Sequence, residues 1–172
     1  WMLKWAGHEN VAVLDGGLQA WQAAGGAIES GAPPAVSASN YTLAPALTAL
    51  TAIETVAKQL GRSTQTLVDA RGAPRFRGEV EPLDPVAGHI PGALNRPFSD
   101  NFGPDGCFKP AATLRAEFQA LLGQRDPATV VHHCGSGVSA VPNLLAMEIA
   151  GMGRSALFAG SWSEWCSDPD RP

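Results

Sequence analysis

The sequence is poor in charge and in cysteine, and it contains no long hydrophobic run. Only 16% of its 172 residues are charged, the formal net charge is −4, and no basic patch is interleaved with aromatic residues. This pattern excludes an ordinary nucleic-acid-binding surface. No apolar run approaches the roughly 18 residues that a membrane-spanning helix needs, so neither nucleic acid nor a membrane is expected as a partner. Hydrophobic residues still make up 45% of the chain, enough for a sizeable core and too many for a disordered chain.

The three cysteines are Cys107, Cys134 and Cys166, an odd number without the spacing of a metal site. They argue against a disulfide scaffold and favour a reducing compartment, so we expect a cytoplasmic protein. No signal peptide is visible, but the chain begins with Trp1 rather than Met, and we expect the true N-terminus to lie upstream. Cys107 and Cys166 are each either an incidental thiol or a redox partner of Cys134.

The most informative stretch covers residues 130–140 and reads Val-Val-His-His-Cys-Gly-Ser-Gly-Val-Ser-Ala. It predicts a strand that ends at Cys134, followed by a glycine-rich loop and then a helix. This order places a thiol at the mouth of a cradle of backbone N–H groups, with the positive end of a helix behind it. Such surroundings favour a thiolate and hold anions, so the sequence offers a nucleophile and an anion site together.

The loop residues fit this interpretation. Its glycines can adopt positive φ, and its serines place hydroxyl groups at the rim. Ser139 is predicted to cap the following helix, with Pro142 in the first turn and Gly151 ending it. An isolated Cys-Gly-Ser-Gly would more often be a buried cysteine before an ordinary turn, but the preceding strand and following helix favour the functional interpretation.

Two classes of enzyme place a cysteine in this way. Tyrosine-phosphatase-like enzymes have His-Cys, five further residues and an arginine, whose planar fork clamps the phosphate. His133 and Cys134 fit that pattern, but Ala140 stands where the arginine is needed. Phosphatase chemistry is therefore disfavoured, whereas rhodanese-like sulfurtransferases share the loop topology and need no such arginine.

The chain resembles the rhodanese family of sulfurtransferases in three stretches, which follow in order from about residue 48 to the C-terminus. Residues 134–140 are similar to the Cys-Gly-Ser-Gly-Val-Thr-Ala loop of the 3-mercaptopyruvate branch, with serine in place of threonine. Residues 68–93 contain Val-Asp-Ala-Arg, Arg-Phe-Arg-Gly and Gly-His-Ile-Pro-Gly-Ala, and residues 158–165 read Phe-Ala-Gly-Ser-Trp-Ser-Glu-Trp. The thiosulfate branch typically has basic residues after the cysteine, and this loop has none.

The resemblance implies a sulfurtransferase in which Cys134 takes a sulfane sulfur from 3-mercaptopyruvate or thiosulfate and becomes a persulfide. The acceptor would be cyanide or a thiol, such as that of a thioredoxin-like protein, and no metal or organic cofactor is implied. Arg75 matches the family arginine that contacts the small anionic donor, and Arg71 is close enough to help or to brace the loop. The loop residues complete the implied donor site: Gly135, Ser136, Gly137, Val138, Ser139 and Ala140.

Several alternatives remain open. Ser136 is a candidate for polarising the donor carbonyl, but the family serine works with groups of a first domain that this chain lacks. The mercaptopyruvate branch usually carries a second donor-binding arginine after Arg75, and residues 79–85 contain none, so the donor stays open. The alternative functions are a cysteine phosphatase or arsenate reductase on the same fold, and a non-catalytic rhodanese-like binding module.

Side chains beside the loop carry further expectations. His132 and His133 are predicted to point to opposite faces of a strand, so they cannot easily share one metal ion. One of them is expected to favour the thiolate, and the other to be packed or exposed. Asp69 and Arg71 are expected to form an ion pair that braces the loop, and His89 is expected to anchor a turn.

An internal repeat indicates the domain organisation. Residues 5–21 resemble residues 149–165 without a gap, and each stretch predicts a helix end, a buried strand, a glycine turn and a tryptophan-bearing turn. We therefore expect a C-terminal piece of a tandem protein. In it, residues 1–26 end a first rhodanese-like domain, residues 27–46 form a linker rich in Ala, Ser, Pro and Gly, and residues 47–172 form the catalytic domain.

The last of these regions is predicted to alternate helices and strands. Apolar spacing predicts helices over residues 50–60 and 114–122, each closed by a glycine, and apolar runs predict strands at 66–69, 129–133 and 155–158. This order favours an α/β rhodanese-like fold, a parallel sheet with helices on both faces. The nucleophile would follow the carboxyl end of a strand, where such sheets bind ligands, and Trp162 and Trp165 would close the core or a domain interface.

Overall fold

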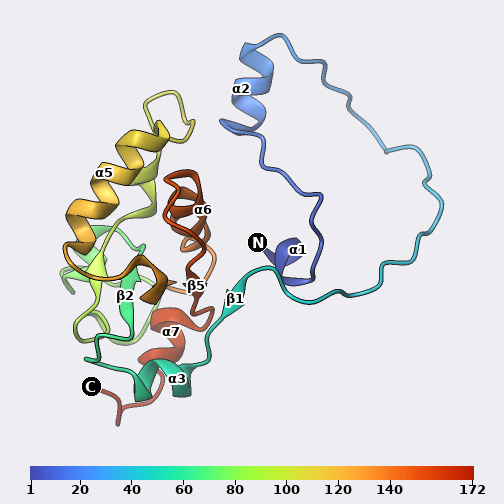
Figure 1. Ribbon diagram of the computed structural model, residues 1–172. Coiled ribbons are helices and arrows are strands. Elements are labelled where there is room, and N and C mark those ends of the chain that lie inside the picture. The colour runs from blue at the N-terminus through green and yellow to red at the C-terminus, as the bar shows by residue number, and fades with distance from the viewer. The chain divides into compact units, whose positions relative to one another are not determined.

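The computed structural model describes all 172 residues, which form two compact units (Figure 1). The larger unit comprises residues 48–101 and 109–172, and the smaller comprises residues 1–47 and 102–108. None of the helices combines the length and the apolar character that crossing a membrane requires.

A five-stranded sheet forms the centre of the larger unit, with the order β1-β5-β4-β2-β3 and every neighbouring pair parallel. In register, β2 and β4 place Leu67 beside Val131 and Asp69 beside His133. The predicted α/β fold with a parallel sheet is therefore confirmed. The strands are β1 (Ala49–Leu50), β2 (Thr66–Asp69), β3 (Leu94–Asn95), β4 (Val130–His133) and β5 (Ala156–Leu157).

Helices cover both faces of this sheet, as predicted (Figure 1). On one face lie α3 (Ile53–Lys58) and α7 (Ser161–Trp165), and on the other lie α5 (Ala111–Leu122) and α6 (Val141–Ile149). Three shorter elements connect them: α4 (Ala73–Phe76), η1 (Phe98–Asn101) and η2 (Pro127–Thr129).

The core on the α3 and α7 face contains both tryptophans of α7. Trp162 and Trp165 are 5% and 1% exposed, which confirms that they close a core. On the other face, α5 and α6 bury apolar side chains at the spacing of one helix side, as their sequence predicts. The residues are Leu114, Phe118 and Leu122 of α5, and Leu144 and Met147 of α6.

Several predicted boundaries are wrong, because pairing with a strand distant in sequence and capping by nearby side chains decide where these elements begin and end. Leu50 belongs to β1, not to a helix, since it pairs with Leu157 of β5 at the sheet edge. Thr129 belongs to η2, where Asp126 accepts a hydrogen bond from the Ala128 N–H at 2.9 Å, so β4 begins one residue later than predicted. Helix α3 accordingly covers only the middle of the predicted segment.

The smaller unit contains α1 (Met2–Trp5), α2 (Gly17–Ala23) and a bridge between Phe102 and Phe108. The buried strand predicted within residues 5–21 is absent, and Val13 and Leu14 are 66% and 56% exposed. Its repeat counterpart β5 is held between β1 and β4, and the smaller unit supplies no such ladder partners. The domain boundaries at residues 26 and 46 stay a prediction.

Candidate active site

Cys134 lies directly after β4, at the carboxyl edge of the sheet, as predicted. Its side chain is buried, with 1% exposure. The neighbouring strand β2 ends at Asp69, and the next residue, Ala70, donates its N–H to the His133 carbonyl at 2.8 Å. The central strands therefore bring the thiol and the residues after β2 to one edge.

Ser161, at the start of α7, fixes the backbone of Cys134. The Cys134 N–H donates to Ser161 Oγ at 3.0 Å, and the Ser161 hydroxyl donates to the Phe158 carbonyl at 3.0 Å. Ser161 has φ 57°, the only positive φ outside glycine. A non-glycine residue held in this region signals a surrounding structure that enforces it, often at a functional site. No role of Ser161 was predicted from the sequence, although this residue lies in the stretch 158–165 that carries the family resemblance.

The α7 backbone adds two further contacts to the nucleophile loop. The Trp162 N–H donates to the Cys134 carbonyl at 3.0 Å, and the Ser163 N–H donates to the Gly135 carbonyl at 2.9 Å. Both carbonyls are thereby turned toward α7, which leaves the other side of the peptide chain to present its N–H groups.

The loop after Cys134 presents free hydrogen-bond donors. None of the backbone N–H groups of residues 135–140 donates to a protein acceptor. Ser136 and Val138 are exposed at the rim, whereas Gly137 is buried with φ 83°. The loop therefore keeps free the backbone donors that an anion-binding cradle needs, and the cradle itself stays a prediction.

Helix α6 begins one residue later than the sequence predicts. The Ala140 carbonyl accepts the N–H groups of Asn143 and Leu144 at 3.1 and 3.3 Å, which makes Ala140 the cap residue. Ser139 as the cap is therefore wrong, because the turn before the helix still includes it and Pro142 offers no N–H in the first helical turn. The position at which phosphatases carry an arginine is occupied by Ala140. Its methyl group is completely buried and supplies no positive charge there.

Arg71 forms the predicted ion pair with Asp69. Its Nη2 lies 2.7 Å from Asp69 Oδ2, and its Nε donates to both carboxylate oxygens at 3.0 and 3.1 Å. Arg71 also donates to the Gly88 carbonyl at 2.7 Å and lies over the Trp162 ring at 4.9 Å. Since both charged side chains are buried, this arginine braces the elements around the loop.

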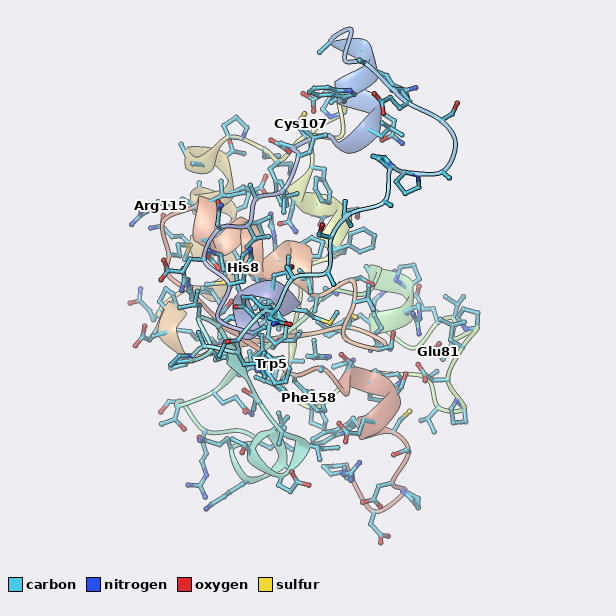
Figure 2. The ribbon with its side chains drawn as sticks, turned by 90° about the vertical axis from the view of Figure 1, so that its right-hand side faces the viewer. Trp5, His8, Glu81, Cys107, Arg115 and Phe158 are labelled. Atoms are coloured by element: carbon cyan, nitrogen blue, oxygen red, sulfur yellow. The ribbon has the colours of Figure 1, made fainter.

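Arg75, on α4, lies against the nucleophile loop. A Cβ placed on Gly135 would be 3.5 Å from Arg75 Nη1, so the guanidinium adjoins the residue after Cys134. Its other donors are engaged by Glu81, with Nη2 at 2.6 Å from Oε1 and Nε at 3.2 Å from Oε2. Figure 2 labels Glu81 on the loop between α4 and β3. The sequence did not indicate this role of Glu81.

Comparison with known proteins agrees with this arrangement. The family described as "Rhodanese-like domain" matches residues 52–168. The chain belongs to the rhodanese family. A probable 3-mercaptopyruvate sulfurtransferase of Pseudomonas aeruginosa is 49% identical over 173 residues, which cover 100% of this chain and 61% of that protein.

A second relative, the putative thiosulfate sulfurtransferase SseB of Mycobacterium tuberculosis, is 45% identical over 172 residues, covering 100% of this chain and 60% of that protein. The chain thus spans about three fifths of the length of these relatives. The wild-type structure of EanB superposes with a TM-score of 0.88 and 23% identity, covering 99% of this chain and 42% of that one. Because the sequence identity is only 23%, this similarity supports the fold of the chain and nothing about its function.

Two adjacent histidines precede Cys134 in this rhodanese domain, and both are completely buried. His132 Nε2 lies 3.1 Å from the Met147 sulfur, whereas His133 Nδ1 lies 4.0 Å from Asp69 Oδ2. They point to opposite faces, as predicted. Burial lowers the pKa of His132 to about 3 and also lowers the pKa of His133, so both rings are neutral at pH 7. Neither ring therefore places a positive charge beside the thiol, and the expectation that one of them favours the thiolate stays a prediction.

The buried His132 makes the stability of the domain depend on pH. The unfolded chain protonates this ring near pH 6.5, whereas the native protein takes up the proton only near pH 3. The unfolded state therefore binds more protons in this window, and stability falls as the pH falls. We expect His132 to account for a loss of about 2 kcal/mol in the free energy of unfolding between pH 7 and pH 5.

Urea unfolding at these two pH values measures this loss. The His132→Asn variant should lose less stability over the same interval than the wild type, whatever its stability at pH 7. An equal loss in both proteins would show that His132 does not titrate as the burial implies.

The other two cysteines differ from Cys134 in their surroundings. Cys107 and Cys166 are free, partly buried thiols. Burial, followed by nearby carboxylates, raises the pKa of each thiol above its ordinary value. Less thiolate at neutral pH favours the interpretation that they are incidental rather than redox partners of the nucleophile.

A buried polar network behind the rhodanese loop was not foreseen from the sequence. Asn143, in the first turn of α6, donates to the Arg96 carbonyl at 2.9 Å and accepts a hydrogen bond from Asn101. The Arg96 side chain donates to Asn101 Oδ1 at 2.9 Å and to Glu117 at 2.8 Å. The network ties the start of α6 to η1 and α5, which fixes the far end of the nucleophile loop.

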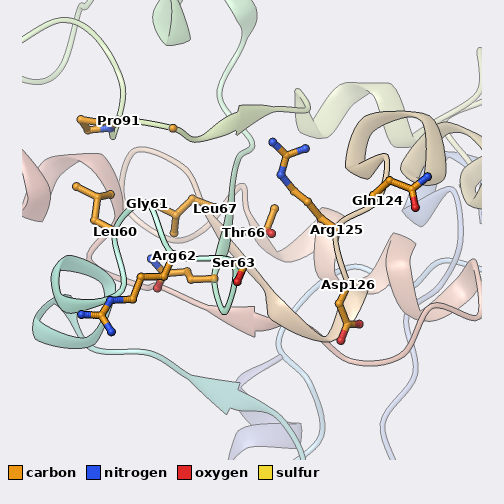
Figure 3. Close-up of a pocket in the computed structure, with 12 residues that line it drawn as sticks. Leu60, Gly61, Arg62, Ser63, Thr66, Leu67, Pro91, Gln124, Arg125 and Asp126 are labelled. Carbon is orange, nitrogen blue, oxygen red and sulfur yellow. The ribbon is translucent and has the colours of Figure 1, made fainter.

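A separate cavity of about 700 Å³ lies at the amino ends of β2 and β4, the edge opposite the nucleophile (Figure 3). Leu60, Leu67, Pro91 and Arg125 are among the residues that line it. None of the predicted site residues does so. The cavity therefore takes no part in the rhodanese site.

Proposed function

We propose that this chain carries the catalytic site of a sulfurtransferase, with Cys134 as the carrier of a persulfide. The observation that carries the proposal is the position of the thiol, buried at the base of a loop whose following backbone N–H groups have no protein acceptor. Such donors stabilise a sulfur-centred anion once it forms. The names of the two relatives above support the same class of reaction.

In the first half-reaction, the Cys134 thiolate attacks the thiol sulfur of 3-mercaptopyruvate or the outer sulfur of thiosulfate. With 3-mercaptopyruvate, a sulfur–sulfur bond forms, the carbon–sulfur bond breaks, and its electron pair leaves on the enolate of pyruvate, which then takes up a proton. With thiosulfate, the sulfur–sulfur bond of the donor breaks and sulfite leaves with its electron pair. In either case Cys134 holds the transferred sulfur as a persulfide.

In the second half-reaction, an acceptor removes this outer sulfur. Cyanide attacks it, thiocyanate leaves, and the bonding electron pair returns to Cys134 as a thiolate. A thiol acceptor, such as that of a thioredoxin-like protein, would take the same sulfur as its own persulfide. Access is from the rim of the loop, where Ser136 and Val138 are exposed.

The neighbouring side chains bind the donor or position the loop. Arg75 binds the anionic group of the donor beside Gly135, because its Nη1 adjoins that residue. Ser136, which is exposed at the rim, would donate a hydrogen bond to the carbonyl group of the sulfur donor. The Arg71 guanidinium already donates to the carboxylates of Asp69 and Glu81 and to the Gly88 carbonyl. It therefore holds the elements around the loop in place and does not bind the donor.

A phosphatase or arsenate reductase is disfavoured by Ala140. A tetrahedral oxyanion needs a planar fork of donors at that position, and a buried methyl group supplies none. A purely non-catalytic module is disfavoured by the intact nucleophile and the loop of free N–H groups that adjoins it.

The formation of thiocyanate from cyanide tests the proposal, with 3-mercaptopyruvate and thiosulfate compared as donors. We expect turnover with ping-pong kinetics, because the persulfide separates the two half-reactions. p-Nitrophenyl phosphate serves as the control substrate and should not be hydrolysed. No thiocyanate with either donor, together with no sulfur gained by the protein, would contradict the proposal.

A further inference from the structure

We infer that Asp84 is a specificity-determining residue of the proposed sulfur-transfer site: its carboxylate competes with the donor's anionic group for Arg75 and favours donors of one negative charge over donors of two. This inference rests on the proposed function. It concerns the acidic segment of residues 79–85, in which the sequence offers no second arginine.

The hydrogen bonds of Arg75 leave it little capacity for a donor. Its Nε and Nη2 both donate to the Glu81 carboxylate, and Nη2 also lies 3.3 Å from Asp84 Oδ2. Nη1 makes no hydrogen bond to the protein, and it lies 3.5 Å from the position that a Cβ on Gly135 would occupy. A donor anion next to Cys134 would therefore meet one open edge of a guanidinium whose charge is already shared by two carboxylates.

Glu81 and Asp84 hold Arg75 in different ways. Glu81 is 4% exposed and also accepts hydrogen bonds from Arg71 at 3.3 Å and from the N–H groups of Leu83 and Asp84 at 3.0 and 3.2 Å. Although burial raises its pKa, the hydrogen bonds from the Arg75 side chain and from the N–H groups of Leu83 and Asp84 outweigh burial and hold the pKa of Glu81 below its ordinary value. Glu81 is therefore a fixed, ionised clamp whose removal would disturb the whole segment.

Asp84 accepts a side-chain hydrogen bond from Arg75 only, so its charge can be removed without dismantling the loop. Its side chain is 9% exposed and that of Arg75 is 20% exposed, which leaves their contact reachable from solvent. An anionic donor that binds Arg75 therefore either displaces the Asp84 carboxylate from the guanidinium or binds beside it.

The charges around Arg75 are not balanced. Two arginines, Arg71 and Arg75, are paired with three carboxylates, those of Asp69, Glu81 and Asp84. The adjacent His133 is neutral because burial lowers its pKa. The cluster therefore carries one excess negative charge, which repels a donor in proportion to the charge of that donor.

This proportionality gives a measurable ratio. At neutral pH, 3-mercaptopyruvate carries one negative charge on its carboxylate, and thiosulfate carries two. If the loss of one nearby negative charge in a partly exposed site strengthens the binding of a monoanion about threefold, it strengthens that of a dianion by about the square of this factor, roughly tenfold.

Steady-state kinetics of Asp84→Asn with both donors test the inference. We expect KM to fall about threefold for 3-mercaptopyruvate and about tenfold for thiosulfate, with kcat nearly unchanged, and both effects to shrink as salt is added. The matched control is Glu79→Gln, which removes the same charge from the same segment at an exposed ion pair with Arg77. The control should leave the ratio of the two KM values as in the wild type.

Asp84→Glu provides the second variant, because it keeps the charge and should retain the wild-type donor preference. Equal changes for both donors in Asp84→Asn, or no change in either, would overturn the inference while the wild type still transfers sulfur. A wild-type protein that gains no sulfur on Cys134 would instead overturn the proposed function, and with it the role of Asp84.

Discussion

The Cys134→Ser variant is expected to lose sulfur transfer to cyanide by at least about 10³-fold with either donor. A serine hydroxyl is protonated at neutral pH and forms no persulfide, so the first half-reaction has no carrier. Because the side chain is buried and the two residues differ by one atom, the fold should be preserved. The rate of thiocyanate formation measures the loss, and thermal unfolding monitors the fold.

The Cys107→Ser and Cys166→Ser variants are the controls for this result. Both thiols have a raised pKa, with burial as the leading cause, and neither lies in the nucleophile loop. Each variant should keep activity within about twofold of the wild type. Loss of activity in either control, or its retention in Cys134→Ser, would assign the sulfur to a different carrier.

The Gly137→Ala variant is expected to lose at least about 2 kcal/mol of stability and at least about 10²-fold of the transfer rate. Gly137 has φ 83°, which an alanine adopts only with strain. In addition, a Cβ at this position would clash with the Ala159 carbonyl oxygen, so the loop would have to move away from the residues that precede α7. That displacement would misplace the N–H groups that follow Cys134.

Gly153→Ala is a matched control for Gly137→Ala. Gly153 has the same φ of 83°, but a Cβ there meets no atom within 4 Å. It should therefore lose stability through backbone strain alone and keep its transfer rate. Equal rate losses in the two variants would show that close packing of the loop against residue 159 does not matter for activity.

Much of the fold follows from local patterns. The apolar runs before Asp69 and Cys134 predict β2 and β4, and the spacing of Leu114, Phe118 and Leu122 predicts α5. The position of the nucleophile after β4 follows from the same patterns. These features depend on residues close together in the chain, and a single sequence records such relations directly.

The missed features depend on contacts between distant segments. Ser161 holds the Cys134 backbone across 27 positions, and nothing in its immediate neighbours indicates that contact. Glu81 clamps Arg71 and Arg75 because the loop folds back over α4, which its prolines and acidic residues do not reveal. The strand expected near Val13 failed for the same reason, since a strand forms only where partner strands exist.

The mass of the protein after treatment with one donor and removal of the excess, followed by peptide mapping, tests most directly whether Cys134 carries the sulfur. We expect a gain of one sulfur atom, confined to the peptide that contains Cys134, lost on addition of cyanide and absent from Cys134→Ser. A protein that gains no sulfur, or that carries it on Cys107 or Cys166, would show that Cys134 is not the persulfide carrier.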